Sequence, residues 1–266
     1  MERCAHFTWQ ISGAFDRVSR TLLLGRLSEI GLPESFLDFR NSYLQPREGR
    51  VTLGSATSDV VQLSDMCFQG TCFGPALWNC FFGGIAGELR DATHEPFLFA
   101  DDLTVLSEYP IATDAETLEL DKQRMREQTL EWGRRNRVCF DANKEQFEII
   151  HPRRGSDIDF RILGTYLDGK LRMKPCTDKM MAKICGKIKS ILRLRSTYEK
   201  SQLISLYKSH VWSIMEFHTS SILLANHTEL DRLDRAQRWF LHEIALSDTE
   251  TFLQYNRAPP SIRRRV

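Results

Sequence analysis

The sequence predicts an α+β fold, in which an antiparallel sheet packs on helices and an all-helical region follows. Two observations indicate it. Short apolar and β-branched runs separated by turn residues recur in the first two thirds of the chain, with amphipathic helical patterns between them. After about residue 175 only helical patterns remain. We therefore predict a mixed body over 1–175, a helical region over 176–250 and a loose basic tail over 251–266.

The composition is that of a globular protein with a hydrophobic core. The chain has 266 residues, of which 42% are apolar and 27% charged, which argues against wholesale disorder. Its 36 basic and 35 acidic residues nearly balance. The seven cysteines form no C-x-x-C pair, which predicts reduced thiols and neither a disulfide framework nor a zinc site. Without a signal peptide or a long apolar run, we expect an intracellular protein, nuclear or cytoplasmic, with no membrane contact.

The first elements follow from apolar spacing and turn residues. Residues 9–15 are typical of a strand that ends in a turn. A helix is predicted over 16–30, because Leu and Ile recur on one face and Gly31 and Pro33 end it. A second, short helix is expected over 34–43.

A hairpin and a glycine-containing loop are predicted next. Strand formers in 50–54 and 59–64 are separated by small polar residues, which is typical of a hairpin. The following loop contains Gly70 and Gly74, where the backbone can adopt conformations that a Cβ would block. A mostly apolar helix, buried on all sides, is expected over 75–89.

The middle of the chain combines one long helix with several strands. Residues 113–116 fit a capping box, and Leu118, Met125 and Trp132 recur at heptad spacing in the helix that follows, to about residue 136. The strands expected here are 97–100, 103–106, 138–140 and 146–150, and a hairpin in which 161–167 turns at Asp168-Gly169 into 170–173.

The last third is expected to consist of helices, the first of which has a basic face. Thr177 is a suitable cap for this helix, and two further helices are predicted over 200–224 and 229–246. A basic face commonly binds phosphate, although a solvated helix surface is the alternative. In the first helix Ile184, Ile188 and Ile191 would face the core, and Lys179, Lys183 and Lys187 would form the basic stripe.

Two adjacent carboxylates lie where the chain must reverse between two apolar strands. Asp101 and Asp102 are therefore expected at the tip of a hairpin. Neighbouring carboxylates repel each other unless a cation lies beside them, and a divalent metal ion is the usual remedy. The alternative is that both are polar turn residues, a position that Asp favours.

Five short blocks follow one another in a recognisable order. They are Ile11 to Val18, Phe68-Gln69-Gly70 with Gly74-Pro75, Phe99-Ala100-Asp101-Asp102, Trp132 with Asn136 and Lys144, and Ile162-Leu163-Gly164. From about residue 10, this order resembles reverse transcriptases (RNA-directed DNA polymerases) of the non-LTR retrotransposon, or LINE-like, type. The resemblance implies a polymerase palm-like sheet in 1–175 and a thumb-like helical region after it. It also implies an RNA template, a DNA primer and deoxynucleoside triphosphates as partners.

The resemblance gives each block a role. In this family two Mg²⁺ (or Mn²⁺) ions held by carboxylates catalyse nucleotidyl transfer, and Asp101 and Asp102 match the hairpin pair. Phe15 matches the aromatic residue that excludes a ribose 2′-hydroxyl, although taken alone it is typical of a core residue. The other matches are Gln69 and Gly70 beside the nucleotide and template, Lys144 near the phosphates, Leu163 and Gly164 at the primer, and Lys179, Lys183 and Lys187 on duplex backbone.

The chain departs from the family pattern at one metal ligand. Where the family has an aspartate that bridges both ions, this sequence has Gln10, whose neutral amide supplies no charge. Residues 1–9 do not resemble the preceding strands of the family, which implies N-terminal truncation with the fingers largely missing, and Phe68 replaces a usual proline. We expect impaired nucleotidyl transfer. The alternatives are a catalytically dead palm and thumb remnant that only binds nucleic acid, and an unrelated metal-dependent α/β enzyme.

Overall fold

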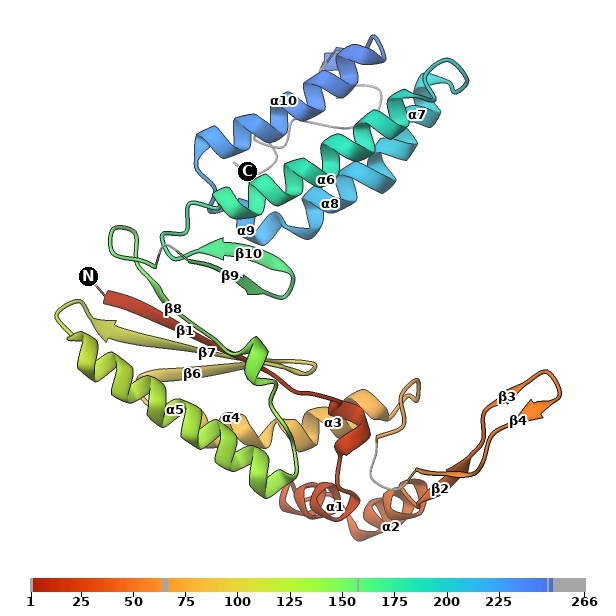
Figure 1. Cartoon of the computed structure of the whole chain (residues 1–266), viewed down its shortest axis with the longest axis vertical. Helices are drawn as coiled ribbons and strands as arrows, with labels where there is room; N and C mark the ends of the chain where they lie inside the picture. The colour runs from red at the N-terminus through yellow and green to blue at the C-terminus, as the bar shows by residue number, and fades with distance from the viewer. Residues whose placement is uncertain (1, 64–66, 157, 248, 251–266) are drawn as a thin grey trace. The chain divides into compact units, whose positions relative to one another are not determined.

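The computed structural model describes residues 2–63, 67–156, 158–247 and 249–250 (Figure 1). Its contacts divide the chain into two compact units, unit 1 (Met1–Phe147) and unit 2 (Glu148–Val266). Each is described by itself below. From Lys174 onward every described element is helical. The assignment of the chain's parts as palm-like and thumb-like stays a prediction.

A sheet with strand order β6-β7-β1-β8 forms the centre of unit 1. Its strand β1 (Glu2–Gln10) pairs antiparallel with β7 (Asp102–Pro110), which pairs with β6 (His94–Phe99). The fourth strand is β8 (Gln146–Ile150), within which the boundary between the units falls. Residues of β1 are buried without alternation from Ala5 to Trp9, as expected for an inner strand.

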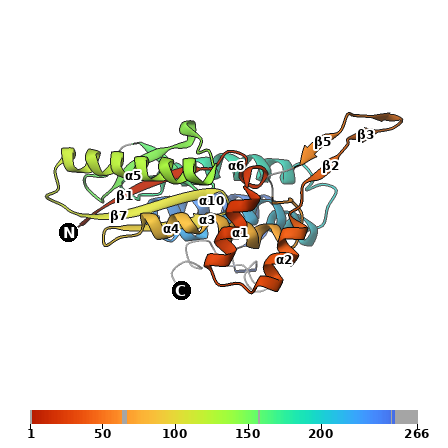
Figure 2. The same ribbon diagram turned by 90° about the horizontal axis from the view of Figure 1, so that it is seen from below.

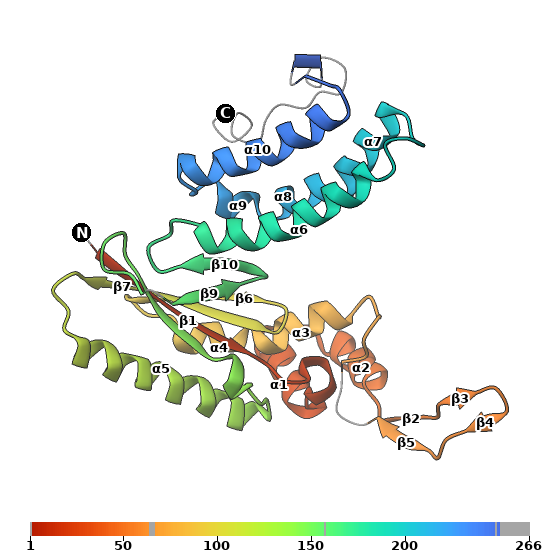
Figure 3. The same ribbon diagram turned by 45° about the horizontal axis from the view of Figure 1, so that its top comes forward.

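Helices α4 and α5 lie along the same side of this sheet in Figures 1 and 3. Trp132 of α5 is fully buried, and its ring contacts the rings of Phe81 and Phe82 with centroids about 6 Å apart, at 6.1 and 5.9 Å. The sheet and its helices confirm the predicted α+β fold. The helices of unit 1 are α1 (Arg20–Glu29), α2 (Glu34–Tyr43), α3 (Gly74–Phe82), α4 (Gly84–Leu89) and α5 (Ala115–Asn136), with 3₁₀ turns at Ala14–Arg17 and Ala142–Lys144.

Several helix predictions in unit 1 are confirmed and others need correction. The helix over 34–43 and the heptad face of the long helix are as predicted. The helix expected over 16–30 begins only at Arg20, because a 3₁₀ turn comes first. The helix over 75–89 is interrupted at Gly83 and exposes Asn79, so it is not buried on all sides. At the long helix the cap is Asp114, whose side chain accepts from the Thr117 amide at 2.7 Å.

The predicted hairpin over 50–64 is a longer arm made of two short ladders. β2 (Arg47–Gly49) pairs with β5 (Val61–Leu63), and β3 (Thr52–Leu53) pairs with β4 (Ala56–Thr57). Figures 2 and 3 show this arm projecting from the helices of unit 1. Val51 and Leu53 are 71% and 83% exposed, so the strand formers face solvent. Residue 64 lies outside the described residues.

The strand predicted over 138–140 is wrong. Helix α5 ends at Asn136, followed by Arg137 with a left-handed φ of 58°, and the chain then crosses the end of β1. There only the bridge between Ile11 and Phe140 forms within the described structure. The contact still has a consequence, because the Asp141 amide donates to the Gln10 carbonyl at 2.9 Å.

Unit 2 begins with a hairpin whose turn differs from the predicted one. β9 (Asp159–Ile162) pairs with β10 (Thr165–Asp168), so the chain reverses at Leu163-Gly164 and not at Asp168-Gly169. Leu163 and Gly164 both have positive φ, 45° and 86°, which suits a two-residue hairpin turn. Asp168 instead accepts from the Met173 amide at 3.0 Å and leads into the next helix.

The helices of unit 2 share one hydrophobic core that includes Ile184, Ile188 and Ile191, as predicted. The first helix begins three residues before Thr177, which is buried and donates to the Met173 carbonyl. The helix expected over 200–224 is broken at His218, and the tail over 251–266 lies outside the described residues. The elements are α6 (Lys174–Leu192), α7 (Lys200–Tyr207), the π-helical turn Lys208–Trp212, α8 (Ser213–Phe217), α9 (Thr219–Ile222) and α10 (His227–Glu243).

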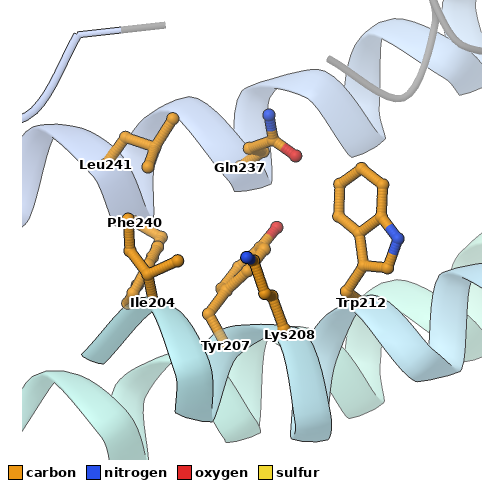
Figure 4. Close-up of a pocket in the computed structure, with 7 residues that line it drawn as sticks. All are labelled: Ile204, Tyr207, Lys208, Trp212, Gln237, Phe240 and Leu241. Atoms are coloured by element: carbon orange, nitrogen blue, oxygen red, sulfur yellow. The ribbon is translucent and has the colours of Figure 1, made fainter. Parts of the chain in front are cut away.

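A small pocket lies in this core between the π-helical turn and α10. Figure 4 shows the Gln237 amide of α10 and the Tyr207 hydroxyl, at the end of α7, turned toward each other. Gln237 is 2% exposed, and its amide nitrogen and oxygen have no hydrogen-bond partner among the described residues. A buried amide in this state costs stability.

Candidate functional site

The two adjacent carboxylates lie at the β6–β7 turn, beside the end of β1. Asp102 is the first residue of β7 and pairs with Gln10, the last residue of β1. Asp101 precedes it in the turn, and its carbonyl accepts from the Ile11 amide at 3.0 Å. Residue 10 therefore lies directly beside this turn. The turn itself requires a left-handed Ala100, with φ 52°.

A buried tryptophan forms a hydrogen bond to the backbone of this turn. Trp78 of α3 is 1% exposed, and its indole Nε1 donates to the Ala100 carbonyl at 2.6 Å. An alanine with positive φ is strained, and a hydrogen bond from a buried side chain helps to fix it. Trp78 was not singled out from the sequence, because nothing in an apolar helix distinguishes a core indole from one that bonds a turn.

The side chain at position 10 bonds the acid that it faces. Gln10 Nε2 donates to Asp101 Oδ2 at 2.8 Å, and Gln10, Asp101 and Asp102 are all half-buried. A hydrogen bond to a carboxylate is stronger than one between neutral groups. The amide therefore stabilises the charge of Asp101 by a hydrogen bond, whereas a carboxylate at this position would repel Asp101 unless a cation lay between them.

These residues do not fit a site for two divalent ions. Among the described residues, no group of three or more His, Cys, Asp or Glu side chains is arranged to hold a metal ion. At the turn, the Gln10 side chain points its N–H group at the Asp101 carboxylate. Mg²⁺ prefers anionic oxygen ligands in a near-octahedral arrangement, which this N–H group cannot supply. The acidic pair alone supplies too few ligands for two ions.

Phe15 and the Gln69 loop lie together in unit 1. The Phe15 carbonyl accepts from the Cys67 amide at 2.8 Å, and the Phe15 ring lies 5.5 Å from that of Trp78. Burial raises the pKa of the Cys67 thiol to about 12, so this thiol stays protonated and serves as an uncharged packing group. A Cβ on Gly74 would lie 3.8 Å from the Phe15 ring, which shows how closely the loop approaches.

Gln69 and Gly70 are exposed at the outer part of this loop. Gln69 Nε2 donates to Asp16 Oδ1 at 3.3 Å, which adds a second link between the loop and the 3₁₀ turn after β1. Gly70 has φ 77°, a conformation that disfavours other residues. The first two sequence blocks are thus joined directly.

Lys144 is exposed, and its Nζ lies 3.8 Å from Asp141 Oδ2. Asp141 is a half-buried acid that the sequence analysis did not single out, and its amide bonds the Gln10 carbonyl. The Asp141 side chain caps its own turn by accepting from the Asn143 amide at 3.1 Å. In the sequence, Asp141 can be recognised as a turn cap because it precedes a short polar segment that contains Lys144.

The remaining predicted site residues belong to unit 2. Leu163 and Gly164 form the β9–β10 turn. Lys179 lies with its Nζ 3.0 Å from the centroid of the Tyr166 ring. The predicted stripe is exposed on α6 at Lys179, Lys183 and Lys187.

No helix in the described part of the chain is long and apolar enough to cross a membrane.

Comparisons with known proteins identify the family. Residues 4–167 match the model of the family described as reverse transcriptase (RNA-dependent DNA polymerase). A telomerase from Candida tropicalis in complex with the TWJ fragment of telomeric RNA is similar in structure, with TM-score 0.50 and 12% identity over 99% of this chain and 45% of that one. The apo telomerase from Candida tropicalis gives TM-score 0.49 and 10% identity over 91% and 46%.

The telomerase in complex with RNA supports the fold alone, because its identity to this chain is low. This chain spans less than half of the length of either telomerase chain. No curated protein matches it. Since the family model covers more than half of the sequence and includes the acidic turn, the Gln69 loop and the Leu163-Gly164 hairpin, the chain belongs to the reverse transcriptase (RNA-dependent DNA polymerase) family.

Proposed function

We propose that this chain is a reverse transcriptase domain of the non-LTR retrotransposon, or LINE-like, type whose template-directed nucleotidyl transfer is impaired. The observation that carries the proposal is the hydrogen bond from Gln10 Nε2 to Asp101 Oδ2 at 2.8 Å. It places an amide beside the acidic turn where the family pattern has a carboxylate.

Family membership and the placement of the blocks support the polymerase part of the proposal. The end of β1, the acidic turn and the Asp141 amide meet through backbone hydrogen bonds, so the frame of the site is intact. In this frame Mg²⁺ or Mn²⁺ would meet only the carboxylates of Asp101 and Asp102. RNA-directed DNA synthesis would then be slow or absent, because the second ion has no adequate ligand set.

The other site residues would bind the substrates. Phe15 would lie against the sugar of a deoxynucleoside triphosphate, because its ring is fixed between Trp78 and Gly74. Gln69 and Gly70 would contact the nucleotide and the RNA template. Lys144 would attract phosphate, and its weak pairing with Asp141 at 3.8 Å would allow this.

A second candidate function is nucleic-acid binding without catalysis. It is favoured by the exposed stripe of Lys179, Lys183 and Lys187, which can bind the phosphates of an RNA template and DNA primer whatever the state of the acidic turn. Leu163 and Gly164, at a tight turn in the same unit, would lie against the primer.

Primer extension on a poly-rA template with Mg²⁺ or Mn²⁺ distinguishes the two. Impaired transfer predicts weak synthesis that Asp101→Ala abolishes and Gln10→Asp increases. The purely binding role predicts no synthesis by the wild-type chain or by the Gln10→Asp variant. Robust synthesis that Asp101→Ala leaves unchanged would contradict both, since it would not depend on the acidic turn.

Filter binding of a primer–template tests the lysine stripe. Lys187→Ala should weaken binding and lower the salt dependence by about one ion, because one phosphate contact is lost. Lys189→Ala is the matched control, because Lys189 is exposed on the same helix but turned by about 200° from Lys187. Equal effects of the two variants would show that the stripe has no special role.

A further inference from the structure

An aromatic side chain of unit 2 is exposed where α8 ends beside the β9–β10 turn. Phe217 is 67% exposed, although large aromatic side chains are usually buried. A Cβ on Gly164 would lie 3.7 Å from the Phe217 ring, so the ring edge rests at the bare backbone of this turn. The ring is supported on one side and open to solvent on the other.

A hydrogen bond fixes the end of α8 to the hairpin. His218 Nδ1 and Thr165 Oγ1 are 3.1 Å apart, and the His218 ring stands perpendicular to that of Phe217, with centroids 5.0 Å apart. Burial, and then the charge of Lys183, lowers the pKa of His218. This histidine is therefore a neutral support for Phe217 at neutral pH.

Cations lie close to this exposed ring. A Cβ built on Gly164 would lie 3.7 Å from Arg161 Nη2 as well as from the Phe217 ring, so the Arg161 guanidinium and this ring approach the same turn. Lys179 lies over the Tyr166 ring, and Arg161 lies 5.6 Å from the centroid of the same ring. Two exposed acids are next to these residues in the chain: Glu216, which accepts from the Thr219 hydroxyl, and Asp178, which pairs with Arg232 at 2.6 Å. We call the Phe217 surface the group Arg161, Gly164, Tyr166, Lys179, Lys183 and Phe217.

We propose that the Phe217 surface binds an unpaired base of a nucleic-acid strand, with the Phe217 ring stacked on the base and Lys179, Lys183 and Arg161 at the flanking phosphates. The proposal rests on the nucleic-acid binding proposed above and adds a base contact to it. An exposed aromatic ring flanked by cations is the combination that holds single strands, because every base offers a π-face and every linkage a charge.

Binding of the full chain to a fluorescent single-stranded oligonucleotide tests this, with fluorescence anisotropy as the readout. Phe217→Ala should weaken binding about 5- to 150-fold, the range for loss of one stacked base. Phe217→Leu should weaken it nearly as much, because it keeps apolar area and loses the π-face, and Phe217→Trp should retain affinity. Leu194→Ala is the control, since Leu194 is an exposed apolar residue just beyond the other end of α6.

The salt dependence separates the ring from the cations. Phe217→Ala should leave the slope of log affinity against log salt unchanged, whereas Lys183→Ala should reduce it by about one. Failure of the wild-type chain to bind any oligonucleotide would refute the proposed function as well. Wild-type binding that Phe217→Ala leaves unchanged would overturn only the base contact. Full affinity of Phe217→Leu beside weakened Phe217→Ala would overturn stacking, because apolar area without a π-face would then be enough to bind the oligonucleotide.

Discussion

Replacing Gln10 by aspartate should turn the acidic turn into a metal-dependent structure. In the wild-type chain Gln10 Nε2 donates to Asp101 Oδ2 at 2.8 Å, so one carboxylate is already compensated. Gln10→Asp removes this donor and adds a carboxylate beside Asp101 and Asp102. Without a cation the three acids repel one another.

The magnitude follows from the bond that is lost and the charge that is added. A hydrogen bond to a charged group contributes about 1.5–3 kcal/mol, and repulsion between half-buried carboxylates adds to its loss. Solvent screening at these half-buried side chains reduces both effects, so we expect a loss of about 2 kcal/mol in chelator. For a unit of this size that lowers the melting temperature by roughly 4–8 °C.

Thermal unfolding followed by tryptophan fluorescence provides the assay. Trp9 precedes Gln10, and Trp78 bonds the Ala100 carbonyl in the turn, so both report on this region. In Gln10→Asp, Mg²⁺ at 100 times its dissociation constant should restore about 2.7 kcal/mol. The wild-type chain should respond little to Mg²⁺.

Gln10→Leu is the control for this experiment. It removes the hydrogen bond and adds no charge, so its melting temperature should fall without becoming sensitive to Mg²⁺. The reasoning would be refuted if Mg²⁺ stabilised the wild-type chain as much as Gln10→Asp, because the amide would then not exclude the ion. An unchanged melting temperature of Gln10→Asp in chelator would equally contradict it.

Three further predictions concern stability. Burial lowers the pKa of His6 to about 4, so between pH 6.5 and 4 only the unfolded chain binds this proton. As the pH falls over this range, the free energy of unfolding of the wild-type chain should therefore decrease by about 3 kcal/mol more than that of His6→Gln. An equal decrease for both proteins in denaturation experiments would contradict this. Gly133→Ala should lower the free energy of unfolding by about 1–3 kcal/mol, because the new Cβ would lie 2.7 Å from the Val138 carbonyl oxygen. Gly25→Ala is the control: a Cβ there meets open space, so urea denaturation should show unchanged or increased stability. Gln237→Met should raise the free energy of unfolding by about 1 kcal/mol, and a loss in the same assay would mean that the buried amide is satisfied.

The parts of the fold that the sequence predicts well are those set by local pattern. The long helix could be predicted because Leu118, Met125 and Trp132 recur on one helix face. The helix over 34–43 could be predicted from the residues that flank it. The hairpin at Asp168-Gly169 was mispredicted because its turn signal competes with Leu163-Gly164, and only pairing with Phe160 and Arg161 decides the register.

The candidate site was predictable in identity and only partly in geometry. Spacing and family resemblance indicated Gln10 and the two acids, but not that the amide nitrogen would bond Asp101. Trp78 and Asp141 reach the site through a helix and a crossing segment that are distant in sequence. Such contacts depend on tertiary packing, which no local pattern specifies.

The place of residue 10 is set by main-chain contacts, whatever its side chain. Its partner in the ladder is Asp102, and its carbonyl accepts from the Asp141 amide. A carboxylate introduced there would arrive at the acidic pair without any rearrangement of the strands. If the function proposed above holds, one substitution at position 10 would therefore be enough to give this turn a third carboxylate, with no change in the backbone around it.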